Sequence, residues 1–114
     1  MKKLFIDTNI VIDLLAAREP FYKEAAQLFS LADKRVIELN ISTLTFANTN
    51  YILLKGKTSL EARQILRKLK MIVKILPLDI KIIDLSLNDI NFNDFEDAMQ
   101  YFSAHENNNE INSL

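Results

Sequence analysis

The fold of this chain is decided by the stretch Leu4-Phe5-Ile6-Asp7-Thr8-Asn9-Ile10-Val11-Ile12-Asp13. Its apolar start predicts a buried strand over residues 3–6, and the spacing that follows predicts a helix over residues 8–17. Functional residues of open α/β sheets gather where strands end at the carboxyl edge, and Asp7 stands at such an end. Asp7 is therefore a candidate metal ligand. The alternative is that Asp7 or Thr8 only caps the helix that follows.

Short apolar runs alternate with helical patterns along the rest of the chain. Further strands are expected over residues 36–41 and 72–76. Further helices are expected over residues 21–33, from Ser42 as cap to Lys55, from the capping box at Thr58 and Glu61 onward, from Asp79 to about Ser86, and from about Asn93 to His105. This alternation predicts one α/β domain over residues 1–114, a three-layer α/β/α sandwich with a short parallel sheet.

Composition excludes several classes of function. The chain has no cysteine, which excludes disulfides, zinc-thiolate sites and thiol nucleophiles. Gly56 is the single glycine, so the phosphate-binding loops that need several glycines are excluded. The longest uncharged run, residues 39–54, carries too many polar side chains to cross a membrane, and no secretory segment is recognisable. We expect a cytoplasmic protein.

Charge is distributed unevenly along the chain. Residues 58–76 hold five lysines and arginines against one glutamate, and residues 77–114 hold eight acids against one lysine. This polarity suits an enzyme that holds a cation and binds a polyanion. Arg63, Arg67 and Lys70 repeat at helical spacing, so they could contact an RNA backbone. The alternative is a solvated helix face.

A second group of acids opens the last predicted helix. Acids in a first helical turn are favoured by the positive end of the helix, which is enough to explain Asp94 and Glu96. Asp97 lies one turn in, and its spacing from Asp94 would let both acids face the same way. Oxygen ligands of this kind suit Mg²⁺ or Mn²⁺, which activate water and stabilise charge on a phosphate.

Three segments resemble the motifs of PIN domains, and they occur in the family's order and near its spacing. They are Asp7-Thr8-Asn9 within residues 5–13, Ile41-Ser42-Thr43-Leu44-Thr45 within residues 41–48, and Asp94-Phe95-Glu96-Asp97-Ala98 within residues 94–104. The resemblance covers essentially the whole chain. It implies a metal-dependent endoribonuclease, commonly the toxin of a bacterial toxin–antitoxin pair (VapC-like), with an acidic pocket at the carboxyl edge of the sheet.

The chain departs from this family pattern in two places. The family's central helix usually presents an acid where Asn48 stands, so Asn48 would be a weak or indirect ligand. The family also continues into a last strand and a further acid, which residues 107–114 do not show, so the domain is C-terminally short. We expect residues 110–114 to form a substitute edge strand, or a partner chain to cover that edge. We also expect weak or absent cleavage unless Glu106 or Glu110 folds back into the site.

The leading hypothesis is a PIN-type endoribonuclease that uses Mg²⁺ or Mn²⁺. Asp7 would be the anchor ligand, Asp97 the second ligand and Asp94 an assisting acid, with a metal-bound water attacking the phosphodiester. The expected partners are RNA, a small antitoxin protein and a second copy of the chain, because 49% of residues are apolar and the family assembles in this way. No membrane partner is expected. The supporting residues are Thr8, Asn9, Ser42 and Asn48.

Two alternative functions are open at this point. A degenerate, non-catalytic PIN-like module that works by protein binding is favoured by Asn48 and by the missing last strand. A response-regulator receiver is also a doubly wound α/β domain, but it would need an acceptor aspartate directly after the third strand. The third strand here ends at Pro77-Leu78-Asp79, which fits that requirement poorly.

Overall fold

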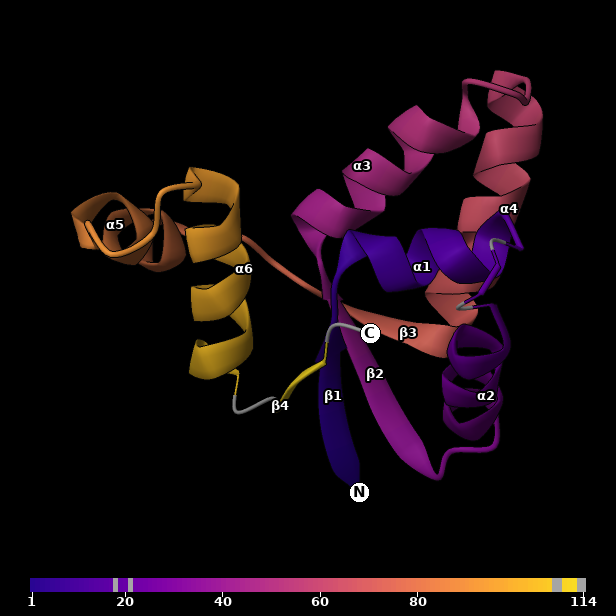
Figure 1. Cartoon of the computed structure of the whole chain (residues 1–114), viewed down its shortest axis with the longest axis horizontal. Coiled ribbons are helices and arrows are strands. Elements are labelled where there is room, and N and C mark those ends of the chain that lie inside the picture. Colours follow the sequence, from indigo (N-terminus) through magenta and orange to yellow (C-terminus); the bar gives the residue numbers. More distant parts are fainter. Residues whose placement is uncertain (18, 21, 108–109, 113–114) are drawn as a thin grey trace.

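The computed structural model describes residues 1–17, 19–20, 22–107 and 110–112 (Figure 1). The elements in chain order are β1 (Lys2–Ile6), α1 (Thr8–Leu15), α2 (Tyr22–Asp33), β2 (Ile37–Ser42), α3 (Thr43–Leu53), α4 (Ser59–Ile72), β3 (Val73–Leu76), α5 (Ile80–Asn88), α6 (Phe95–Glu106) and β4 (Glu110–Asn112). The strands form one parallel sheet in the order β3-β2-β1-β4. The α/β class and the short parallel sheet are confirmed, and each predicted element is present close to its expected bounds.

The helices form two groups with the sheet between them (Figure 1). Helices α1 to α4 pack on one another and on the strands, and α5 packs against α6 as a separate pair. This is the layered arrangement that alternating strands and helices produce. No helix in the described part of the chain is long and apolar enough to span a membrane.

The main apolar core joins β1, β2 and β3 to α1 through α4. Its most buried members include Ile6, Ile10, Leu39 and Ile41, none more than 1% exposed. Burying one such side chain stabilises the fold by about 1.5–3 kcal/mol. Among the described residues, none from α5 or α6 belongs to this cluster. A second, small contact of Phe5, Leu76 and Ala104 joins α6 to the sheet.

Side chains cap α1, α3, α4 and α5 at the predicted positions. Thr58 and Glu61 form the predicted capping box at α4, with hydrogen bonds of 3.2 and 2.9 Å. A cap of this kind typically stabilises a protein by about 1 kcal/mol. The other caps are Asp7 on α1, Ser42 on α3, Asp79 on α5 and Asp94 on α6.

The C-terminal segment forms the edge of the sheet beside β1. Strand β4 runs parallel to β1, with Glu110 opposite Leu4 and Asn112 opposite Ile6. It thereby pairs backbone groups of β1 that would otherwise invite another chain. The predicted substitute edge is confirmed for residues 110–112, and residues 113–114 lie outside the described part.

Candidate functional site

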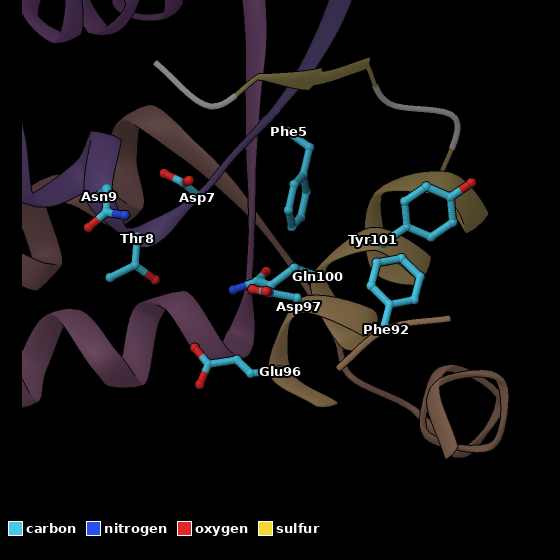
Figure 2. A pocket seen from close by; sticks show the side chains of 9 residues that line it. All are labelled: Phe5, Asp7, Thr8, Asn9, Phe92, Glu96, Asp97, Gln100 and Tyr101. Atoms are coloured by element: carbon cyan, nitrogen blue, oxygen red, sulfur yellow. The ribbon is translucent and has the colours of Figure 1, made fainter. Parts of the chain in front are cut away.

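A pocket of about 440 Å³ opens where β1 ends, between the start of α1 and the facing side of α6 (Figure 2). The parallel sheet places the end of β1 at its carboxyl edge, where such sites form. Both leading candidate acids, Asp7 and Asp97, line this pocket although they come from opposite ends of the chain. The full lining is Phe5, Asp7, Thr8, Asn9, Phe92, Glu96, Asp97, Gln100 and Tyr101.

Asp7 both caps a helix and faces the pocket. Its Oδ1 accepts a hydrogen bond of 3.1 Å from the backbone N–H of Ile10, which satisfies one of the unpaired donors at the start of α1. An ionised carboxylate offers about four acceptor positions on two oxygens. Capping therefore leaves acceptor capacity for a cation in the pocket. The two sequence-based interpretations of Asp7 are compatible.

The start of α6 decides which of its acids enter the pocket. Asp94 is the N-cap, and its Oδ1 accepts a 2.8 Å hydrogen bond from the backbone N–H of Glu96. Because Asp94 lies outside the regular helix, it does not share a pocket-lining face with Asp97, contrary to the expectation from their spacing. Glu96 is the second residue of the helix. Glu96 and Asp97 instead line the pocket, and the side chain of Glu96 extends toward α3 (Figure 2).

Asn48 contacts the site through Glu96. Its Nδ2 donates a 2.9 Å hydrogen bond to Oε1 of Glu96, which orients that carboxylate. The contact gives Asn48 an indirect position at the site, next to an acid that comes from α6. Glu96 was not predicted as a pocket residue, because its position in the first helical turn is sufficient to explain an acid there. The family usually has an acid at position 48, and its replacement by Asn48 was the signal that a carboxylate from another element could occupy that part of the site.

A buried hydroxyl connects the two walls of the pocket. Thr45 on α3 is fully buried, and its Oγ1 accepts hydrogen bonds from Oγ1 of Thr8 at 3.1 Å and from Nε2 of Gln100 at 3.0 Å. Ser42, also fully buried, caps α3 by accepting a 3.1 Å hydrogen bond from the backbone N–H of Thr45. Ser42 is not a lining residue, so it supports the site by fixing the first turn of α3.

The donor atoms of the pocket fit a weakly held divalent cation. Among the described residues, no group of three or more acids and histidines is close enough to hold a metal ion. Mg²⁺, however, is usually bound by one or two carboxylates, with water and substrate phosphates completing its shell. Asp7 and Asp97 supply two carboxylates. Oε1 of Gln100 is a further oxygen, buried and without a hydrogen-bond partner in the described part of the chain.

The predicted basic stripe lies apart from the acidic pocket. Arg63, Arg67 and Lys70 share one face of α4 and line a hollow of about 220 Å³ together with Phe46 and Leu66. This hollow has no lining residue in common with the pocket around Asp7. The structure thus keeps the three basic residues together and does not bring them to the acids.

Aromatic side chains form the outer wall of the acidic pocket. Phe92 and Tyr101 both line it, with ring centroids 5.4 Å apart. His105 lies in the last turn of α6 and stacks on Tyr101 with ring centroids 5.8 Å apart. Phe92 and Tyr101 therefore contribute to the candidate site.

A parallel α/β domain with a carboxylate pocket at the carboxyl edge of its sheet defines the class of this protein. The chain belongs to the PIN-domain family, because the family model described as PIN domain matches residues 3–111. This membership sets the receiver alternative aside.

Individual relatives agree with the family assignment. The chain is 27% identical over 110 residues to Ribonuclease VapC1 of Aquifex aeolicus (strain VF5), covering 90% of this chain and 74% of that protein. It is similar in fold to a chain of the VapBC2 complex of Rickettsia felis bound to a promoter DNA fragment, with TM-score 0.70, 16% identity and coverage of 96% and 84%. It is also similar to Mycobacterium tuberculosis VapC20, with TM-score 0.72, 15% identity and coverage of 97% and 88%.

Proposed function

We propose that this chain is a divalent-metal-dependent endoribonuclease of the PIN type and the toxin of a toxin–antitoxin pair. The observation that carries the proposal is the convergence of Asp7 and Asp97 in one pocket at the carboxyl edge of the sheet. The similar proteins support the same activity. The Aquifex aeolicus relative is named a ribonuclease, and the Mycobacterium tuberculosis VapC20 structure is described as a sarcin–ricin loop cleaving toxin.

Asp7 and Asp97 are the residues that would hold Mg²⁺ or Mn²⁺, with the amide oxygen of Gln100 as a further donor. When bound, such a cation activates water for attack on a phosphodiester and neutralises charge on the phosphate. Glu96, oriented by Asn48, is a carboxylate in the same pocket that can accept a proton. No protein nucleophile is required, because water is the attacking group.

The aromatic wall suits a single-stranded RNA substrate. Unstacked bases bind aromatic side chains, and the exposed part of Tyr101 lies at the pocket beside Phe92. Arg63, Arg67 and Lys70 would contact the RNA backbone only outside the acidic pocket, because they line a separate hollow. Their replacement should therefore weaken RNA binding and leave metal binding unchanged.

Metal binding tests the site directly. We expect calorimetric titration with Mn²⁺ to show binding to the wild-type chain, and binding at least about 10-fold weaker in Asp7→Asn and in Asp97→Asn, because each variant loses one of two carboxylates. Asp79→Asn is the matched control, because Asp79 caps α5 in the same way that Asp7 caps α1 and lies outside the pocket. Equal Mn²⁺ binding by the wild-type chain and all three variants would show that Asp7 and Asp97 do not form the metal site.

The exposed apolar face of α5 is the proposed contact surface for a second copy or an antitoxin. Ile80, Ile83 and Leu87 recur at helical spacing, and they are 75, 38 and 65% exposed. Ile90 follows the helix and is 92% exposed. Contiguous exposed apolar residues of this kind mark interaction surfaces. Light scattering should show a dimer that Leu87→Glu converts to a monomer. A monodisperse wild-type monomer that also fails to recover a partner would contradict the assignment.

A non-catalytic PIN module is the second candidate function. It is favoured by the absence of a three-acid cluster among the described residues and by the amide at position 48. The same titration separates the two functions, because a protein-binding module has no need to hold Mn²⁺ between Asp7 and Asp97.

A further inference from the structure

The main core does not fix the distance between the two candidate ligands. Asp7 follows β1, whose residues Leu4 and Ile6 belong to the main apolar cluster, whereas α6 contributes no described residue to it. Among the buried residues that the structure describes, the small contact of Phe5, Leu76 and Ala104 links α6 to the sheet. Apolar contacts are non-directional, so this contact alone does not specify how α6 is rotated about its axis. A directional contact is needed to hold Asp97 opposite Asp7.

The structure contains such a contact in a fully buried position. Thr45 is 0% exposed, and its hydroxyl oxygen lies 3.1 Å from Oγ1 of Thr8 and 3.0 Å from Nε2 of Gln100. Thr8 is the residue next to Asp7, and Gln100 lies one helical turn after Asp97. One hydroxyl therefore connects the residue next to Asp7 with the residue one helical turn after Asp97. Figure 2 shows Thr8 and the amide of Gln100 directed into the space between α1 and α6.

Thr45 is itself held in place by the cap of α3. It lies in the first turn of α3, where its backbone N–H donates a hydrogen bond to the side chain of Ser42. Hydrogen bonds in a water-free environment are stronger than in water, and leaving their partners unsatisfied is costly. The hydroxyl of Thr45 thus fixes the positions of Thr8 and Gln100 relative to each other, in addition to stabilising the fold.

We propose that Thr45 is a positioning residue that sets the spacing of Asp7 and Asp97 for cation binding by holding Thr8 and Gln100. The proposal rests on the proposed function for its link to the cation. Thr45 does not line the pocket, so it acts through its two partners and touches neither the cation nor the substrate. Supporting contacts of this kind around metal ligands typically change metal affinity about 10- to 100-fold when they are removed.

Three variants of the full chain test the proposal. Thr45→Val keeps the shape of the side chain and removes the hydroxyl, and Thr45→Ser keeps the hydroxyl. Thr49→Val is the matched control, because Thr49 is equally buried on the same helix and its hydroxyl donates to a backbone carbonyl of its own helix rather than to a side chain of α1 or α6. Two properties are measured: Mn²⁺ affinity by calorimetry, and the backbone amide resonances of residues 7–9 and 97–100 in the metal-free protein.

We expect Thr45→Val to weaken Mn²⁺ binding about 10-fold, and Thr45→Ser and Thr49→Val to stay within about 2-fold of wild type. Without metal, Thr45→Val should shift the resonances of both segments, and Thr49→Val should leave residues 97–100 unshifted. The positioning role would be overturned if Thr45→Val left the resonances of residues 97–100 unshifted. It would also be overturned if Thr45→Val and Thr49→Val bound Mn²⁺ with equal affinity. If the wild-type chain binds no Mn²⁺, the proposed function is overturned, and so is the proposed link between Thr45 and the cation. The resonances of the metal-free protein then show separately whether Thr45 positions residues 7–9 and 97–100.

Discussion

Two substitutions of Asp7 separate its structural role from its proposed chemical role. The structural role is the 3.1 Å hydrogen bond from the backbone N–H of Ile10 to Oδ1, which caps α1. Asparagine caps helices about as well as aspartate, so Asp7→Asn should lower the free energy of unfolding by only about 0.5 kcal/mol, through loss of negative charge at the helix start. Asp7→Ala also loses the cap, which adds about 1 kcal/mol. For a domain of this size that additional loss lowers Tm by about 4 °C.

Metal binding should respond differently from stability. Both substitutions remove a carboxylate from a pocket that offers few of them, so both should weaken Mn²⁺ binding by at least about 10-fold. Urea unfolding in metal-free buffer measures the first effect, and calorimetric titration measures the second. The reasoning is refuted if Asp7→Asn is as unstable as Asp7→Ala, or if Asp7→Asn binds Mn²⁺ as tightly as the wild-type chain.

Three further predictions follow from individual contacts. The hydroxyl of Ser103 is fully buried without a hydrogen-bond partner in the described part of the chain, so Ser103→Ala should raise the free energy of unfolding by up to about 1 kcal/mol in urea titrations. The backbone and side-chain hydrogen bonds from Thr58 lower the pKa of Glu61 below 4.5, so the capping carboxylate stabilises the fold above that pH and loses this effect as the pH falls through the lowered pKa. The Tm difference between wild type and Glu61→Ala should therefore be larger at about pH 6 than at about pH 3. Asn48→Asp places a second carboxylate beside Glu96, so calorimetry should show Mn²⁺ binding tightened by about 10-fold, and unchanged affinity would contradict the position given to Asn48.

Features that depend only on residues close together in the sequence could be predicted. The capping box at Thr58 and Glu61 and the passage from β1 into α1 each depend on adjacent residues, and both are present as expected. Asp7 could be placed at the carboxyl edge of the sheet because it directly follows the first strand. Asp97 follows no strand, and its place beside Asp7 was an expectation from the acids around it and from the resemblance to PIN domains. The helical spacing of Arg63, Arg67 and Lys70 likewise places them on one face of α4.

The remaining features depend on contacts between distant segments. Thr45 bonds to residues 37 and 55 positions away, and although it lies in a segment that resembles a PIN motif, nothing in that segment indicates these two contacts. Glu96 was misplaced because a shift of one residue in the helix start decides which first-turn acids face inward. Asp94 was given a place in the site for the same reason, although it caps α6.

The central claim is that Asp7 and Asp97 together form a metal-dependent ribonuclease site. The measurement that tests it most directly is cleavage of a mixed RNA substrate with Mn²⁺ by the wild-type chain and by Asp97→Asn, with Asp79→Asn as the folded control. We predict slow, Mn²⁺-dependent cleavage by the wild type and the control, and none by Asp97→Asn. Cleavage that persists in Asp97→Asn, or no cleavage by a wild-type chain that binds Mn²⁺, would contradict the account.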